Sequence, residues 1–309
     1  MAVTRIARVS LTTADPDGLA AFYCEALGFE RRGIAHREEQ RFSQLMGLDS
    51  TEARTLLLDL GRQTLELVGF APSGRRYPPD ITANDPRFQH IAIVVADMEA
   101  AHARLSACLG WTPITHPAPQ RLPASSGGVV AFKFRDPEGH PLELLAFPLD
   151  RVPPPWREPQ RQGPCLGIDH SAVVVADTTR SVRFYEKLLG FRVTSRSLNR
   201  GPEQDRLDGV VAALVEVTAL APDTAEPPHL ELLCYRSPAK TLPPEALPHS
   251  SDVAATQLVF AVDRLPELVP DLLAAEVGLI SAGMVTLDDG RPAALIRDPD
   301  GHALLLLGS

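Results

Sequence analysis

The chain has 309 residues, a formal net charge of −9 and 44% hydrophobic residues, a composition that suits two globular domains. The negative charge makes nucleic acids and anionic membranes poor partners. The four cysteines lie far apart, and no apolar run approaches the roughly 18 residues of a membrane helix. We therefore predict a cytoplasmic protein without a disulfide framework.

The first predicted elements are a strand and a helix at residues 9–29, and the same pattern returns at 171–191. Both segments pass through Ala-Asp to a helix that bears Phe-Tyr and ends in Leu-Gly-Phe. Apolar residues at helical spacing give each helix one buried face, and the glycine suits a left-handed helix end. Such self-similarity indicates an internal repeat.

Two weaker copies lie at 90–111 and 257–279, each with a strand, an aspartate and a helix. A second repeat relates 132–147 to 295–307, where Asp-Pro-acid-Gly-His predicts a tight turn between two strands. The histidines of these turns should lie on the outside of the molecule with a structural role.

Together the repeats predict an α+β fold of four βαβββ modules, each a strand, a helix and then two or three strands. We expect neighbouring modules to pair within each half, which gives two tandem domains with curled mixed sheets. The proline-rich segment 149–164 is typical of a stiff linker between them. The predicted domains are 1–148, with modules 1–72 and 86–148, and 165–309, with modules 166–238 and 253–309.

Three motifs occur twice each in the chain. They are His-x-x-x-x-Val-x-Asp at 90–97 and 170–177, Phe-Tyr-x-x-x-Leu-Gly-Phe at 22–29 and 184–191, and Asp-Pro-x-Gly-His at 136–140 and 298–302. With these motifs the chain resembles the vicinal oxygen chelate superfamily, which includes glyoxalase I, extradiol dioxygenases and bleomycin-binding proteins. The resemblance implies that paired modules form a cup, with metal ligands on the first and last strands of each module.

The resemblance gives four candidate ligand positions in each half of the chain. They are Arg8, Glu66, His90 and Glu143 in the first half, and His170, Glu231, Gln257 and Leu305 in the second. The three glutamates each stand between leucines on a predicted strand, so each projects to the face opposite its leucines. If the leucines face the helices, all three carboxylates face into a cup, where burial favours a cation as partner.

The first half is the preferred metal site, with His90, Glu143 and Glu66 as ligands for Zn, Ni, Co, Mn or Fe. Arg8 has no acceptor lone pair, so it would pair with Glu66 or hold an anionic group of the substrate. The second half offers the weaker set His170, Glu231 and Gln257, because Leu305 replaces its final acid.

The expected function is that of a glyoxalase-like, metal-dependent lyase or isomerase acting on a small substrate with adjacent oxygens. Glu143 or Glu66 would move the proton. A metal-free binding protein of the bleomycin-resistance kind is the alternative, and an iron-dependent dioxygenase is a second. Extradiol cleavage needs two histidines and a carboxylate, and neither half alone holds both histidines. We expect a small-molecule ligand and a monomer or homodimer.

Overall fold

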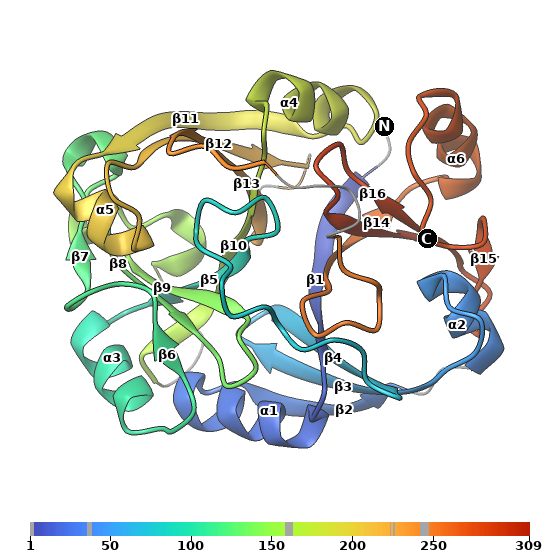
Figure 1. Ribbon diagram of the computed structural model, residues 1–309, viewed down its shortest axis with the longest axis horizontal. Helices are drawn as coiled ribbons and strands as arrows, with labels where there is room; N and C mark the ends of the chain where they lie inside the picture. Colours follow the sequence, from blue (N-terminus) through green and yellow to red (C-terminus); the bar gives the residue numbers. More distant parts are fainter. Residues whose placement is uncertain (1–2, 36–38, 158–162, 223, 225, 242–246) are drawn as a thin grey trace.

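The computed structural model describes residues 3–35, 39–157, 163–222, 224, 226–241 and 247–309, and they form the predicted four modules (Figure 1). Module one contains β1 (Val3–Thr13), α1 (Pro16–Phe22), a π-helical turn (Tyr23–Leu27), β2 (Glu30–Ala35), α2 (Glu39–Met46), β3 (Glu52–Leu60) and β4 (Gln63–Ala71). Module two contains β5 (Gln89–Val95), α3 (Met98–Ser106), β6 (Thr112–Pro113), β7 (Gln120–Arg121), β8 (Val130–Arg135) and β9 (Pro141–Ala146).

The second half repeats this order. Module three contains β10 (Cys165–Val174), α4 (Thr178–Lys187), β11 (Arg192–Arg200), α5 (Pro202–Asp208), β12 (Leu214–Ala221) and β13 (His229–Ser237). Module four contains β14 (Thr256–Val262), α6 (Leu265–Ala274), β15 (Val285–Thr286), β16 (Pro292–Arg297) and β17 (Ala303–Gly308). The predicted α+β fold is therefore confirmed.

The repeated aspartate and glycine mark the two ends of the module helix. Asp97 and Asp177 are the N-caps of α3 and α4, and their carboxylates accept hydrogen bonds from backbone N–H groups of the first turn. Gly28 and Gly190 follow the helices of modules one and three with φ of 76° and 79°. An L side chain is strained in this left-handed region, so glycine ends the helix and turns the chain into the next strand.

The modules pair differently from the sequence expectation. β1 pairs antiparallel with β14, and β5 pairs antiparallel with β10. One sheet thus has the order β15-β16-β17-β14-β1-β4-β3-β2, from modules four and one. The other has the order β11-β12-β13-β10-β5-β9-β8-β6, from modules three and two. The expected pairing inside each half is wrong, because neither 1–148 nor 165–309 forms a cup of its own.

The repeat pattern could not show this crossing. Every module presents the same kind of apolar first strand to a partner, so alternation and spacing leave open which module it meets. The prediction of one cup in each half was wrong because the stiff proline-rich segment was taken as the border between two cups. In the structure it joins β9 to β10, two strands of one sheet, with β5 between them.

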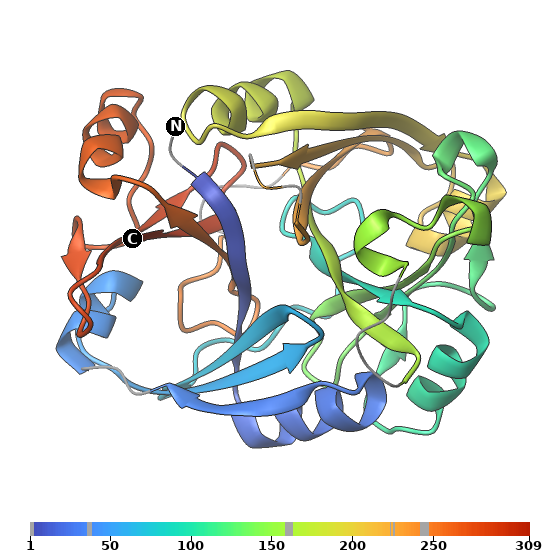
Figure 2. The same cartoon turned by 180° about the vertical axis from the view of Figure 1, so that it is seen from behind.

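Alternation along the strands separates an apolar face from a second face that lines the cup. Leu142, Leu144, Leu230 and Leu232 belong to the main core cluster, together with residues of α1, α3, α4 and α6. These four helices lie around the outside of the molecule in Figures 1 and 2. The face opposite these leucines is therefore free to carry a site. Within the described residues, no helix has both the length and the apolar character needed to cross a membrane.

Candidate metal centre

The cup of modules two and three, here the open cup, holds a cavity of about 730 Å³. Its wall includes His90, Glu143, His170 and Glu231, each from a first or last module strand. The sequence interpretation had divided these four side chains between two halves. The crossed pairing of β5 with β10 brings them together, so the preferred and the weaker ligand sets each contributed half of one site.

The ligand atoms of the open cup lie close to one another. His90 Nε2 is 2.8 Å from Glu143 Oε2, and His170 Nε2 is 3.5 Å from Glu231 Oε2. One nitrogen or oxygen from each of His90, Glu143 and His170 falls within 4.8 Å of the others, a spacing that a single ion could bridge. Two imidazoles and one carboxylate form a donor set suited to Zn, Fe, Co, Ni or Mn, and the Glu231 carboxylate lies next to His170.

His90 supports this fit because its ring nitrogens are buried without an aligned partner. The side chain is 2% exposed, and among the described residues neither Nδ1 nor Nε2 makes a hydrogen bond of acceptable geometry. The short distance to Glu143 is therefore close approach without hydrogen-bond alignment. Such an approach is expected when both atoms are directed at a common ion. Without an ion, the unpaired buried nitrogen would cost about 1–3 kcal/mol.

Electrostatics prepare His90 and Glu143 to act as ligands. Burial lowers the pKa of His90, and the nearby Lys133 charge lowers it further, so the imidazole is neutral. Burial alone would raise the pKa of Glu143, but Lys133 and His90 outweigh it and lower the pKa. Lys133 lies opposite Glu143 in the register of β8 and β9 and is itself buried. A neutral imidazole and a charged carboxylate are the forms that bind metals.

His170 and Glu231 form a charged pair in the open cup. Burial opposes the charge on His170, but Glu231 and Asp169 outweigh it and raise its pKa to about 9. Burial likewise opposes the charge on Glu231, yet His170 and His229 lower its pKa to about 2. A metal that binds His170 Nε2 must therefore displace a proton, and affinity should rise with pH over the neutral range.

Sequence reasoning missed His229, Lys133 and Asp169 among the polar residues of the open cup. His229 lies two positions before Glu231 on β13, so alternation places it on the same face, and its ring is 5.2 Å from that of His170. Lys133 stands between two phenylalanines, the same signal that located the glutamates. Asp169 gave no such signal, because it lies at a break in the register of β10 with β5.

Modules one and four form a second cup, here the filled cup, and it holds the remaining candidates. Arg8 donates from Nε to Glu66 Oε2 at 3.0 Å, one of the two roles foreseen for it. Gln257 donates to Met46 Sδ, and Leu305 belongs to an apolar cluster with residues of α2. Glu66 therefore shares no cup with His90 and Glu143, and the predicted three-ligand set is wrong.

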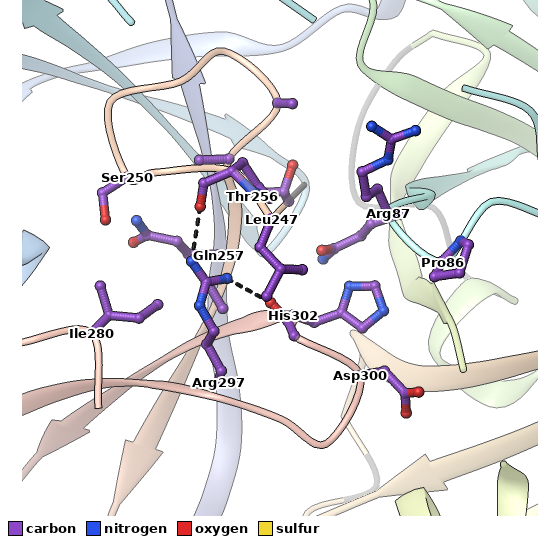
Figure 3. Close-up of a pocket in the computed structure, with 16 residues that line it drawn as sticks. Pro86, Arg87, Leu247, Ser250, Thr256, Gln257, Ile280, Arg297, Asp300 and His302 are labelled. Carbon is purple, nitrogen blue, oxygen red and sulfur yellow. Dashed lines mark hydrogen bonds between the residues drawn. The ribbon is translucent and has the colours of Figure 1, made fainter. Parts of the chain in front are cut away.

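Gln257 also borders a small cavity where the two sheets meet, shown in Figure 3. Its volume is about 30 Å³, enough for little more than one water-sized molecule. Arg297 spans one side and donates to the carbonyls of Pro248 and Gly301. A substrate would not fit here, and the open cup remains the candidate site.

The turn histidines are structural, as expected, but they are not on the outside. His140 and His302 are buried. His140 Nε2 lies 2.9 Å from the carbonyls of Thr12 and Val253, and Nδ1 lies 2.8 Å from Asp136 Oδ2. His302 Nε2 contacts the carbonyl of Val174 in the same way. Each turn therefore ties one sheet to the other.

These features define a protein of paired βαβββ modules with one open and one filled cup. A family model described as the Glyoxalase/Bleomycin resistance protein/Dioxygenase superfamily matches residues 5–144 and 167–306, and the chain belongs to this superfamily. A search of curated proteins found no match.

Solved structures share the whole architecture. Glyoxalase I from Zea mays superposes with a TM-score of 0.65 at 17% identity, covering 98% of this chain and 92% of that one. A putative dioxygenase from Bacillus subtilis gives a TM-score of 0.58 at 11% identity, covering 99% and 85%. Identities this low establish the fold alone, and the choice of reaction depends on the cup.

Proposed function

We propose that the protein is a divalent-metal-dependent lyase or isomerase of the glyoxalase kind, with one active site in the open cup. The observation that carries this proposal is that ligand atoms of His90, Glu143 and His170 lie within 4.8 Å of one another, with the Glu231 carboxylate 3.5 Å from His170 Nε2. His90, Glu143 and His170 would hold the metal, and the Glu231 carboxylate would lie beside it. The bound metal would polarise two adjacent oxygens of a substrate and stabilise negative charge that develops on them.

The two carboxylates would divide the remaining work. Glu143 is the more buried, with an 8% exposed side chain beside His90. Glu231 is 21% exposed and faces the cavity, so it has room to meet a substrate C–H bond. We assign Glu231 to accept the proton from one substrate carbon and to return it to the neighbouring carbon. The product is then an isomer of the substrate. Glu66 has no part in this step, because it lies in the filled cup.

An iron-dependent dioxygenase is the second candidate, and one observation favours it. His90, His170 and Glu143 form a set of two histidines and one carboxylate, the ligand set of non-haem iron oxygenases. The sequence had led us to exclude extradiol cleavage because the two histidines were expected in separate cups. That expectation was wrong, since His90 and His170 line the same cavity. The metal-free binding protein is disfavoured by the same buried polar cluster, which suits an ion better than an apolar ligand.

The first experiment measures metal content by elemental analysis after loading with Zn, Ni, Co, Mn or Fe. Wild type and Gln257→Ala should each bind about one equivalent, and His90→Ala should lose it. Equal binding by His90→Ala, or none by wild type, would contradict the proposal. Gln257 is the matched control because it holds the equivalent position in the filled cup.

A second measurement separates the two reactions. Small 2-hydroxycarbonyl compounds incubated in D₂O should exchange their carbon-bound hydrogen without oxygen uptake, and Glu231→Gln should abolish the exchange. Oxygen consumption by the iron-loaded protein on a vicinal diol or catechol, without such exchange, would favour the dioxygenase instead.

A further inference from the structure

His170 is held from the side opposite its candidate metal-binding nitrogen. Asp169 Oδ2 lies 3.0 Å from His170 Nδ1, and both side chains are buried. Because a carboxylate only accepts, Nδ1 carries the proton. When the ring is neutral, its lone pair is then on Nε2, the atom that faces Glu231.

A backbone irregularity makes this contact possible. Strand alternation would send adjacent residues to opposite faces of the sheet. The pairing of β10 with β5 shifts its register between Ile168 and His170, so that Asp169 is the extra residue. Asp169 and His170 both line the cavity as a result.

The linker between β9 and β10 fixes Asp169 in turn. Trp156 donates from Nε1 to Asp169 Oδ1 at 2.8 Å. Its ring packs against β10 at Gly167, where an added Cβ would lie 2.7 Å from a ring carbon. A larger residue at Gly167 would displace the indole, so the glycine lets the linker reach the carboxylate.

The filled cup contains a natural comparison for this arrangement. β1 has the same register shift, between Ile6 and Arg8, and the extra residue there is Ala7. Alanine has no side-chain acceptor, and the next residue is an arginine rather than a histidine. The carboxylate therefore accompanies the histidine in the cup that can bind a metal and is missing from the cup that cannot.

From this geometry we infer that Asp169, anchored by the linker residue Trp156, is a positioning residue that orients His170 as a metal ligand. The inference rests on the metal site of the proposed function and extends it to residues outside the ligand set. Carboxylates that accept from the second nitrogen of a ligand histidine fix its tautomer and orientation. Through Trp156, the proline-rich linker thus helps to hold the site in place.

Metal affinity is the first test. Asp169→Asn should weaken binding of Co²⁺ or Zn²⁺ by roughly 10- to 100-fold while one equivalent still binds. The visible spectrum of bound Co²⁺ should change, because the ligand field at His170 changes. Trp156→Phe, which removes the anchoring N–H together with the five-membered ring that carries it, should give a smaller loss in the same direction. Unchanged affinity and spectrum in Asp169→Asn would overturn the inference.

Asp136→Asn is the matched control. Asp136 is also a buried aspartate that contacts the Nδ1 atom of a histidine, His140, but it lies outside the open cup. This variant should lose stability and keep wild-type metal affinity. An equal loss of affinity in both variants would reduce Asp169 to a purely structural role and overturn the inference.

Nitrogen-15 histidine spectra of the metal-free protein give a test that does not need the metal. Wild type should show a slowly exchanging His170 Nδ1–H proton, and Asp169→Asn should shift it or lose it. If wild type shows this proton but binds no metal, the proposed function is refuted, although the hydrogen bond between His170 and Asp169 exists. Metal binding without this proton would refute the inference alone.

Discussion

The open and filled cups are built from equivalent strands and differ at three of the four positions that carry the candidate ligands, with a glutamate retained at the fourth. His170, Glu231, His90 and Glu143 in the open cup correspond to Arg8, Glu66, Gln257 and Leu305 in the filled one. Lys133 corresponds to Leu295, since each pairs with the last of these positions. One fold therefore supports both a polar site and an apolar core, and the inward residues decide which.

The helix that follows the second strand of modules one and three shows how the cups diverged. In the filled cup, α2 places Phe42, Leu45 and Met46 in an apolar cluster with residues of β4, β14, β16 and β17. In the open cup, α5 ends in Asp208, which accepts from Lys133 at 2.7 Å, from Tyr235 at 2.8 Å and from Gln204 at 2.7 Å. The first helix fills its cup, and the second adds a polar wall to a cavity.

The largest expected effect is on stability and concerns the packing of α2 in the filled cup. Phe42 is 3% exposed and stacks on Phe70 at a centroid distance of 6.0 Å. Phe42→Ala should lower the free energy of unfolding by about 4 kcal/mol, because it removes apolar contacts and leaves a cavity. Denaturant unfolding measures the loss. Metal affinity should stay unchanged, and a large change in it would mean that the cups are not independent.

A smaller effect is expected when the open cup is made to resemble its counterpart. Lys133→Leu installs the residue type of Leu295 and should cost about 3 kcal/mol, since it leaves the buried Asp208 charge without its cation. Adding Asp208→Leu should recover part of this loss, which calorimetric melting can measure. A double variant less stable than Lys133→Leu alone would contradict this expectation. It would show that losing the hydrogen bonds from Tyr235 and Gln204 to Asp208 costs more than leaving the Asp208 charge unpaired.

The smallest effect concerns pH at the junction between the sheets. Burial opposes the charge on His140, but Asp136 outweighs it and raises the pKa above the unfolded value of 6.5. The protonated ring can donate from both nitrogens, to Asp136 and to the carbonyls of Thr12 and Val253. Its stabilisation is fully present below pH 6.5 and is lost as pH rises through the folded pKa.

The free energy of unfolding of wild type and His140→Gln should therefore differ most at acidic pH and converge as the solution becomes alkaline. Denaturant titrations at several pH values measure this difference. A gap that widens with pH would show that His140 is neutral in the folded protein. The same substitution at His302 compares the two junctions directly.

Much of the fold was predictable because each module states its own pattern. The Ala-Asp before the helices of modules one to three, the Leu-Gly-Phe of modules one and three and the Leu-Glu-Leu strands are local signals, and the structure uses them as expected. The inward direction of Glu143 and Glu231 followed from strand alternation alone. These features depend on neighbours in sequence, so a single chain is enough to recognise them.

The site itself was only half predictable, because it depends on contacts that the repeats leave undetermined. Pairing β5 with β10, rather than β5 with β1, is a choice between equivalent apolar edges. Asp169 was hidden by a register shift that breaks alternation, and α2 was not anticipated as the filling of a cup. His90, Glu143, His170 and Glu231 were predicted from the sequence, but they were assigned to the wrong partners, and Lys133, Asp169 and His229 were not predicted.

The crossed pairing also orders events during synthesis. β5 and β10 meet over a short stretch of chain, with His90 opposite Ala172, whereas β1 must wait for β14, with Val9 opposite Leu258. Closing the longer loop costs more entropy and comes later on the ribosome. The half of the molecule that contains the open cup can thus assemble first. β1 pairs with β4 on one edge, and its other edge stays unpaired until β14 has been made.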